Sequence, residues 1–526
     1  MGEKGKFRLK MKHKKLPIGI QSFEYLRSEP HYYVDKTNFV KKLIDEGKYY
    51  FLSRPRRFGK SLFLDTLRQA FLGKRELFNG LFLEDNWNWQ KKHPVIYISF
   101  GAGVHRTVEE LTETQNVILL EHGREYGIEL YYRNVKDKFM ELIKKLNEKF
   151  NKKTVVLIDE YDKPILDNID KREVAIEIRE ALKNFYSVLK DADAHLKFVF
   201  ITGVSKFSKV SLFSGLNNLE DITISREYAT ICGYTQKEFE VVFEDRLQGV
   251  DLEEVKRWYN GYSWCGEKVY NPFDVLLFLK ERQYRPYWFE TGTPTFLIKL
   301  LQKERYFIPE LERLEASERI IGSFDVEDIE VETLLFQTGY LTIEKVEQAG
   351  ASRIYTLVYP NMEVRASLAD HILDYYCKAR GKKEKNLIRM YRALSNGQID
   401  ELKEIFHSFF ASIPYEWYRK NEMSNYEGYY ASIFYCYFNA LGFDVRVEDA
   451  TNQGQLDMAV LFEDRCFIFE FKVVELSPEG KPMEQLHKKK YHEKYLSDFK
   501  EIYLIGVEFS KKDRNIIGFE WERLLS

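Results

Sequence analysis

The segment Tyr49-Tyr-Phe-Leu-Ser-Arg-Pro-Arg-Arg-Phe-Gly-Lys-Ser61 decides the predicted fold of the first half of the chain. It begins with a short apolar run, typical of a buried strand, and passes through an arginine-rich loop to Gly-Lys-Ser at the start of a helical stretch. In such a loop, backbone N–H groups at a helix N-terminus face phosphate oxygens, the lysine reaches the β- and γ-phosphates, and the hydroxyl binds Mg²⁺. The segment therefore predicts an ATP site in which Lys60 and Ser61 take the last two roles.

The loop departs from the common pattern G-x-x-x-x-G-K-[ST] at its first position, where Arg54 replaces glycine. We expect Arg56 and Arg57 to add positive charge around the phosphates. Phe58 and Gly59 complete the predicted nucleotide-binding loop.

A buried strand that ends in two acidic residues, Thr154-Val-Val-Leu-Ile-Asp159-Glu160, supplies the second half of the predicted ATP site. We expect Asp159 to hold Mg²⁺, directly or through water, and Glu160 to orient and deprotonate the attacking water. A further strand ends at Thr202, which fits a polar sensor of the γ-phosphate; taken alone, it is equally a capped strand end.

Residues 16–235 alternate between short apolar runs and amphipathic stretches, which predicts an α/β domain with a parallel sheet covered on both faces. The predicted strands are Tyr49–Ser53, Val95–Ser99, Thr154–Ile158 and Lys197–Thr202, and the clearest crossover helices are Val135–Phe150 and Lys171–Asp191.

Residues 236–420 are mostly helical in pattern, with predicted helices at Thr235–Phe243, Asp251–Trp258, Pro272–Glu281 and Thr293–Lys303. The stretch Val331–Val358 predicts a helix followed by a hairpin, which fits either a winged helix or a generic helical lid. Residues 1–15 form a basic tail that either touches nucleic acid or is simply solvated.

The α/β pattern returns over residues 421–526. The predicted elements are a helix at Tyr426–Leu441, strands at Val445–Glu448, Leu456–Phe462 and Cys466–Val473, a helix, and a last strand at Glu501–Val507. The helix Glu484–Tyr495 mixes Lys, His and Tyr, which suits a phosphate backbone with stacked bases and equally suits a solvated helix face.

Two acidic residues in this last region form a candidate metal site. Glu470 and Lys472 are two apart on one predicted strand and so face the same side, and an antiparallel hairpin would bring Asp457 beside Glu470. Two converging carboxylates can hold Mg²⁺ or Mn²⁺, and Lys472 would orient or help deprotonate the water that attacks a phosphodiester.

Several motifs in order resemble the AAA-ATPase-like family of bacterial and archaeal proteins. They are YYVDKTNFVKKLI (32–44), SRPRRFGKSLFLDTL (53–67), VVLIDEYDKPI (155–165), ITGVSKFSKVSLFSGLNNLEDIT (201–223), WYNGY (258–262) and VYNPFDV (269–275). The resemblance implies a P-loop ATPase domain fused to a C-terminal nuclease-like domain of the PD-(D/E)XK superfamily, and it makes RPRRFGKS the usual form of the phosphate loop.

The spacing from Asp457 to Glu470 and Lys472 resembles the PD-(D/E)XK core. By the same resemblance, Glu427 matches the glutamate of the preceding helix and is a further catalytic candidate. Gln485 and Tyr491 match a trailing Gln and Tyr of some members. The chain departs from the pattern at Leu456, where the superfamily has its proline, and at Gln455, where an arginine is frequent.

Composition limits the remaining choices. With 80 basic and 82 acidic residues the net charge is −2, which excludes a generally basic nucleic-acid coat protein but not a local basic groove. Five scattered cysteines argue for a reducing compartment, and no apolar run approaches the roughly 18 residues that span a bilayer, so we expect a cytoplasmic protein without membrane contact.

The motifs together favour an ATP- and metal-dependent nuclease acting on nucleic acid, DNA above RNA. An ATP-switched nucleic-acid-binding or signalling protein that does not cleave, and an ATPase that remodels a protein partner, stay open as alternatives. A homo-oligomer would allow arginines such as Arg226 to act on a neighbouring subunit's ATP.

Overall fold

The computed structural model describes residues 13–206, 213, 218–289, 295–304, 306–322, 326–376, 380–413, 427–451, 453–475 and 477–525. Most of the predicted basic tail, and part of the 201–223 motif, therefore lie outside the described residues. The chain divides into two compact units, Met1–Trp288 with Glu315–Thr356, and Phe289–Leu314 with Leu357–Ser526.

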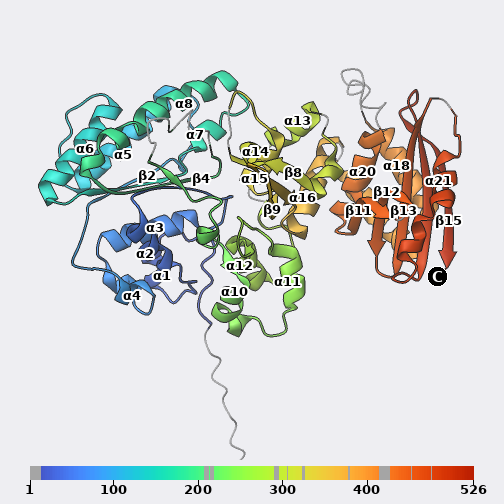
Figure 1. Ribbon diagram of the computed structural model, residues 1–526, viewed down its shortest axis with the longest axis horizontal. Coiled ribbons are helices and arrows are strands. Elements are labelled where there is room, and N and C mark those ends of the chain that lie inside the picture. Colours follow the sequence, from blue (N-terminus) through green and yellow to red (C-terminus); the bar gives the residue numbers. More distant parts are fainter. Residues whose placement is uncertain are drawn as a thin grey trace, which may run out of the picture. The chain divides into compact units, whose positions relative to one another are not determined.

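A five-stranded sheet forms the centre of the first unit (Figure 1), with the strand order β2-β3-β4-β1-β5 and parallel pairing throughout. The strands are β1 (Tyr49–Ser53), β2 (Val95–Ser99), β3 (Thr154–Asp159), β4 (Leu196–Gly203) and β5 (Glu220–Asp221). The four predicted strands are confirmed. They are almost wholly buried, because helices cover both faces of the sheet.

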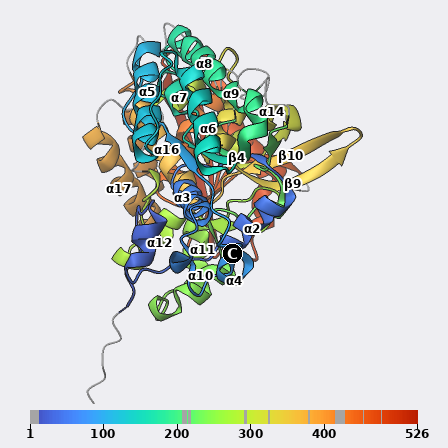
Figure 2. The ribbon, with the colours of Figure 1, turned by 90° about the vertical axis from the view of Figure 1, so that its left-hand side faces the viewer.

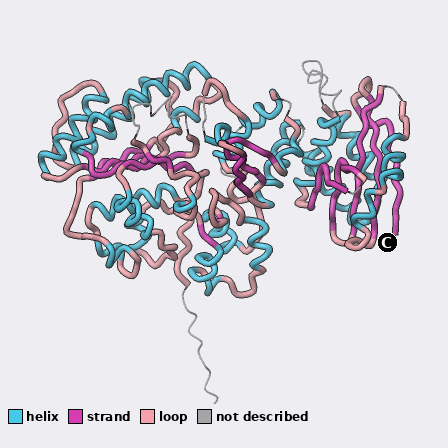
Figure 3. The backbone as a smooth tube through the Cα atoms, in the orientation of Figure 1, coloured by secondary structure: helices cyan, strands magenta, loops and turns pink. Residues whose placement is uncertain are grey.

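The covering helices segregate by their order in the chain: α1–α4 lie on one face of the sheet and α5–α8 on the other (Figure 3). Helix α6 shows why these segments fold as they do, since its buried Phe139, Leu142, Ile143 and Leu146 follow the spacing of one helix face. The helices are α1 (Phe23–Ser28), α2 (Thr37–Glu46), α3 (Lys60–Phe71), α4 (Leu83–Asn86), α5 (Val108–Glu125), α6 (Val135–Phe150), α7 (Lys163–Leu166), α8 (Arg172–Tyr186) and α9 (Val188–Asp191).

A helical group with its own aromatic core follows the sheet. Tyr32, Phe239, Phe243, Tyr259 and Tyr270 are among the side chains buried in that core. Its elements are η3 (Arg226–Tyr228), β6 (Tyr234–Thr235), α10 (Gln236–Val242), α11 (Leu252–Tyr259), β7 (Val269–Tyr270) and α12 (Pro272–Glu281), close to the predicted helices.

The helix and the hairpin predicted within Val331–Val358 are confirmed, and the winged helix that they could form stays a prediction beside the helical lid. A strand, two helices and a hairpin follow one another, and the three strands pair in the order β8-β10-β9. Figure 2 shows the hairpin projecting beyond the helices around it. The elements are β8 (Leu314–Ser317), α14 (Glu318–Gly322), α15 (Val331–Thr338), β9 (Thr342–Ala349) and β10 (Ser352–Val358).

The second unit contains a five-stranded mixed sheet with the order β11-β12-β13-β14-β15, in which only β13 and β14 pair in parallel. The strands are β11 (Asp444–Thr451), β12 (Gly454–Phe462), β13 (Arg465–Val474), β14 (Glu501–Ser510) and β15 (Asn515–Leu525). The prediction that the strand beginning at Glu501 is the last is wrong. Strand β15 was not predicted because this edge strand carries charged and partly exposed residues in place of a buried apolar run.

Helices cover both faces of this sheet. Phe434 on α20 (Glu427–Ala440) packs on Phe469 and Phe471, whereas Leu486 of α21 (Lys481–Lys489) packs with Ile468 on the other face. The predicted helix Glu484–Tyr495 is broken at Lys490, which adopts a left-handed conformation between α21 and η8 (Tyr491–Tyr495). The remaining helices of this unit are α13 (Thr295–Lys303), η6 (Ile308–Glu312), α16 (Met362–Tyr376), α17 (Arg380–Asn396) and α18 (Ile399–Phe410).

Within the described ranges, the helices are all too short or too polar to cross a lipid bilayer.

Candidate active sites

The phosphate loop joins β1 to α3, and its backbone is shaped for an anion. Gly59, the residue before α3, has φ +89°, and Arg57 has φ +69°. No side chain caps the first N–H groups of α3. Uncapped N–H groups at a helix N-terminus attract phosphate, so this helix end fits the triphosphate predicted there.

Lys60 is buried and points back over the loop. Its Nζ donates hydrogen bonds to the carbonyl oxygens of Arg54 and Pro55, both at 2.9 Å. Burial lowers the pKa of Lys60, while the charge of Asp159 acts in the opposite direction, which places the two residues within electrostatic reach. Ser61 follows at the second position of α3 and is partly exposed.

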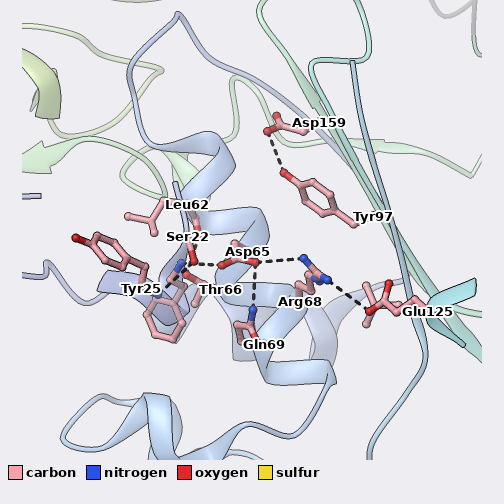
Figure 4. Close-up of polar contacts among 12 residues, drawn as sticks. Ser22, Tyr25, Leu62, Asp65, Thr66, Arg68, Gln69, Tyr97, Glu125 and Asp159 are labelled. Atoms are coloured by element: carbon pink, nitrogen blue, oxygen red, sulfur yellow. Dashed lines mark hydrogen bonds and ion pairs between the residues drawn. The ribbon is translucent and has the colours of Figure 1, made fainter. Parts of the chain in front are cut away.

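The predicted acidic pair lies at the carboxyl end of β3. Asp159 is buried, accepts a hydrogen bond of 3.3 Å from the Tyr97 hydroxyl (Figure 4), and accepts one of 3.0 Å from the backbone N–H of Glu160. Glu160 has φ +51°, and burial, followed by the charge of Asp159, raises its pKa. A Cβ on Gly101 would lie 3.1 Å from Glu160 Oε2, so the glycine leaves room for this carboxylate.

The strand order places Thr202 between the phosphate loop, which follows β1, and the acidic pair at the end of β3. Strand β4 lies between β1 and β3, and Thr202 is in register with Leu52, close to the end of β1. Thr202 is fully buried, and its Oγ1 has no hydrogen-bond partner among the described residues. The loop, the acidic pair and the threonine thus meet at the carboxyl edge of a parallel sheet, where ligands bind in open α/β folds.

Arg56, Arg57 and Phe58 differ from one another in their surroundings. The two arginines are exposed, and the Arg57 guanidinium lies 4.8 Å from the centre of the Phe273 ring. Phe58 is buried against Tyr262 and Trp264, with ring centres 4.7 and 5.4 Å away. A side chain packed in this way contributes to the predicted nucleotide loop only through its backbone.

A polar network anchors α3 behind the loop (Figure 4). Asp65 accepts a hydrogen bond of 2.7 Å from the backbone N–H of Phe23 and one of 3.3 Å from Gln69. Arg68 lies 4.0 Å from Asp65 and 3.8 Å from Glu125. These contacts fix the helix that presents Lys60.

The second candidate site lies on β12 and β13. The strands are antiparallel, with Met458 opposite Phe469. Asp457 and Glu470 therefore occupy the next pair of positions along the two strands. Asp457 Oδ2 accepts a hydrogen bond of 2.8 Å from the backbone N–H of Phe471. The register and the influence of the Asp457 charge on the pKa of Glu470 place these two carboxylates near each other.

The other predicted residues surround Glu470, which is fully buried. Lys472 Nζ lies 3.5 Å from Glu470 and 3.4 Å from Glu427 on α20. Gln485 on α21 donates a hydrogen bond to Glu470 Oε1 and lies 3.5 Å from the Tyr491 hydroxyl. The structure therefore gathers all of these residues from two strands and three helical segments.

The electrostatics of this cluster suit a cation. Burial and then the charge of Asp457 raise the pKa of Glu470, and burial raises that of Asp457. Glu470 Oε2 is buried without a hydrogen-bond partner in the described part of the chain. Burial alone would lower the pKa of Lys472, but the charges of Asp457, Glu427 and Glu470 raise it.

These carboxylates fit Mg²⁺ or Mn²⁺ as two of its ligands. Across the described residues, no three Asp, Glu, His or Cys side chains are grouped closely enough to hold a metal by themselves. A Mg²⁺ ion commonly takes one or two protein carboxylates and fills its other positions with water and substrate phosphate oxygens. The orphaned Glu470 oxygen matches that requirement.

One acidic residue near this site was not predicted from the sequence. Glu448 on β11 lies between the residues paired with Leu456 and Met458, and its charge raises the pKa of Asp457. Of the helix Glu484–Tyr495, for which the sequence left a nucleic-acid surface and a solvated face open, Tyr491 and Tyr495 are buried in the core. Their helix is amphipathic, and its aromatic face packs on the sheet.

Comparison with known proteins agrees with both sites. Residues 17–213 match the family described as "Predicted AAA-ATPase", and residues 425–519 match the "PD-(D/E)XK nuclease superfamily". The "Uncharacterized protein in vnfD 5'region" of Azotobacter chroococcum mcd 1 is 50% identical over 515 residues, which are 98% of this chain and the whole of that relative. The chain belongs to the AAA-ATPase-like family. In this AAA-ATPase-like protein, the first match contains the phosphate loop and the acidic pair, and the second contains Asp457, Glu470 and Lys472.

Proposed function

We propose that this protein hydrolyses ATP at the carboxyl edge of the first sheet and cleaves phosphodiester bonds of nucleic acid, DNA above RNA, at the Asp457 cluster. The observation that carries the second activity is the convergence of Asp457, Glu470 and Lys472, with one buried carboxylate oxygen of Glu470 unpartnered among the described residues. Burying two neighbouring carboxylates is costly, because each raises the cost of ionising the other, and a bound cation would offset that cost.

The ATPase step follows from residues already placed. The N-terminus of α3 binds the phosphates. Lys60 stays held by the Arg54 and Pro55 carbonyls and points its remaining N–H at the β- and γ-phosphates. Mg²⁺, held by Ser61 and Asp159, would neutralise charge that develops on the phosphates. Glu160 accepts the proton of the attacking water, and its raised pKa makes it a stronger base than an ordinary carboxylate. Thr202 Oγ1 contacts the γ-phosphate.

The nuclease step uses the second cluster. A divalent cation on Asp457 and Glu470 would polarise the scissile phosphate and neutralise its added negative charge. Lys472 keeps its proton because its pKa is raised, so it orients the attacking water and stabilises negative charge. The cation would lower the pKa of that water, whose proton passes to solvent as the new P–O bond forms and the bond to the leaving oxygen breaks. Glu427 holds the Lys472 ammonium, and Gln485 fixes Glu470.

We place this activity in the cytoplasm and in a homo-oligomer. Arg226 is exposed on η3, so it is the arginine we assign to the ATP of a neighbouring subunit. A cut that depends on ATP would couple the two sites.

The full chain should be incubated with plasmid and with circular single-stranded DNA, with Mg²⁺ or Mn²⁺, and with or without ATP. We expect metal-dependent cleavage that EDTA abolishes and that ATP changes in rate. ATP-dependent DNA binding without cleavage under either metal would contradict the nuclease proposal and favour the switched binding protein. Absence of both cleavage and DNA binding, with ATP hydrolysis intact, would favour the remodelling ATPase.

A further inference from the structure

Arg54 stands where a phosphate loop ordinarily has its first glycine, and its side chain is one of the most deeply buried cations in the described chain. It is 0% exposed, and burial lowers its pKa to about 10, which still leaves it charged at neutral pH. A buried charge is stable only when its surroundings satisfy it. The contacts of Arg54 therefore indicate which part of the structure it stabilises.

Carbonyl oxygens from three segments accept hydrogen bonds from the two Nη groups of the guanidinium, while its Nε is buried without a hydrogen-bond partner among the described residues. Its Nη1 donates to Ser53 at 2.9 Å and to Thr223 at 2.7 Å, and its Nη2 donates to Tyr228 at 3.2 Å. Thr223 follows β5, and Tyr228 lies in η3. The side chain thus ties the end of β1 to segments far along the chain.

Trp264 holds both ends of the same loop. The Arg54 guanidinium lies 4.0 Å from the centre of the Trp264 ring, a cation–π contact, and the edge of Phe58 packs on Trp264 at 5.4 Å. The backbone N–H of Arg54 also bonds to the Gly203 carbonyl at 3.2 Å, and the Phe58 carbonyl accepts from Gly233 at 3.3 Å. Side-chain packing on one indole, in place of glycine flexibility, sets the curvature of this loop.

The clamp acts directly on the residues that receive Lys60. The Lys60 ammonium bonds to the carbonyl oxygens of Arg54 and Pro55, so holding Arg54 also positions the lysine. Pro55 is fixed from another side, because a Cβ on Gly339 would lie 2.7 Å from its ring. The contacts of the Arg54 guanidinium are with the Ser53, Thr223 and Tyr228 carbonyls and with the Trp264 ring, so it acts on the loop through its shape.

We propose that Arg54, braced by Trp264, is a positioning residue for ATP: it replaces the first glycine of the loop by locking the loop in shape and holding the carbonyls that place Lys60. The inference rests on the proposed ATPase function and names a determinant of that site. Restoring glycine at position 54, which recreates the common loop sequence, should therefore weaken ATP binding.

Binding of a fluorescent ATP analogue with Mg²⁺ tests the inference in the full chain, at a temperature far below the unfolding midpoint of every variant. We expect Arg54→Gly to raise the Kd at least about tenfold, and Arg54→Lys to fall between it and the wild type. Added guanidinium at a non-denaturing concentration should restore part of the affinity of Arg54→Gly. Arg133→Gly removes an exposed loop arginine and is the matched control, with an unchanged Kd.

A double variant separates positioning from general loosening of the fold. If Arg54 acts through Lys60, the double variant Arg54→Gly with Lys60→Gln should bind ATP no more weakly than Lys60→Gln alone. If Arg54→Gly damages the fold independently, its loss of ATP affinity should add to that of Lys60→Gln. A wild-type Kd in Arg54→Gly, or fully additive losses, would overturn the inference and leave the ATPase proposal standing. If Arg54→Gly does not fold, Arg54→Lys carries the same comparison. Failure of the wild type to bind the analogue would overturn the ATPase proposal and, with it, the inference.

Discussion

Cleavage of DNA by this protein should fall by about a thousandfold or more when either Asp457 or Lys472 is changed to alanine. Asp457→Ala removes one of the two carboxylates proposed to bind the cation. It also leaves the backbone N–H of Phe471 without the hydrogen bond that it donates to Asp457. Lys472→Ala removes the ammonium that lies 3.5 Å from Glu470 and 3.4 Å from Glu427. The measurement is the initial rate of plasmid cutting with Mn²⁺ at saturating protein.

The two variants should remain folded, because Asp457 and Lys472 are only partly buried and are not part of the aromatic core. Lys488→Ala provides a matched control, since Lys488 is exposed on α21 near the same site and should retain cutting within about twofold. The ATPase rate without DNA should be unchanged in Lys472→Ala. Cutting that survives both Asp457→Ala and Lys472→Ala would show that another site, or a contaminant, is responsible.

At the first site, Lys60→Ala and Glu160→Gln should fail in different ways. Lys60→Ala removes the cation that reaches the β- and γ-phosphates, so ATP binding should weaken by about a hundredfold or more. Glu160→Gln keeps the shape of the site but removes the proton acceptor. We expect it to bind ATP with near wild-type affinity and to hydrolyse it about a hundred to ten thousand times more slowly.

Equilibrium binding and single-turnover hydrolysis separate these two effects. Lys74→Ala, an exposed lysine beyond the end of α3, should behave as the wild type in both assays. Equal hydrolysis by Lys60→Ala and Glu160→Gln, or loss of binding in Glu160→Gln, would refute the roles given to these residues. If ATP gates the nuclease, Glu160→Gln should stay in the ATP-bound state. It should then cut DNA at the rate that the wild type shows with ATP bound.

Local pattern predicted the elements of both sites because each depends on short, strongly apolar strands. Strands β1 and β2 have the predicted bounds, and β3 extends one residue further, to Asp159. The polar residues at their ends then follow from parallel pairing, since parallel strands end at one edge. The same logic, applied to an antiparallel hairpin, brought Asp457 beside Glu470.

Contacts between segments far apart in sequence were not predictable from these patterns. The burial of Arg54 depends on Thr223, Tyr228 and Trp264, and a single sequence contains no signal for that packing. The available signals were the arginine in place of glycine and the nearby Trp-Tyr-Asn-Gly-Tyr motif at residues 258–262. Tyr262 of that motif packs on Phe58, and Trp264, two residues further on, packs on Arg54.

The sequence alone left two interpretations of the segment Glu484–Tyr495 open, a surface for nucleic acid and a solvated helix face. In the structure, Tyr491 and Tyr495 are buried in the core of the second sheet, and Lys494 pairs with Asp449 at 2.6 Å. The burial of these tyrosines depends on contacts with the sheet that local pattern does not contain.

The central claim is that one chain holds two separate divalent-ion sites, and crystals grown with Mn²⁺ and a non-hydrolysable ATP analogue test it most directly. Anomalous scattering should give one manganese peak between the triphosphate, Ser61 and Asp159, and a second peak between Asp457 and Glu470. Absence of the second peak at saturating Mn²⁺, or a nucleotide bound away from Lys60, would contradict the claim.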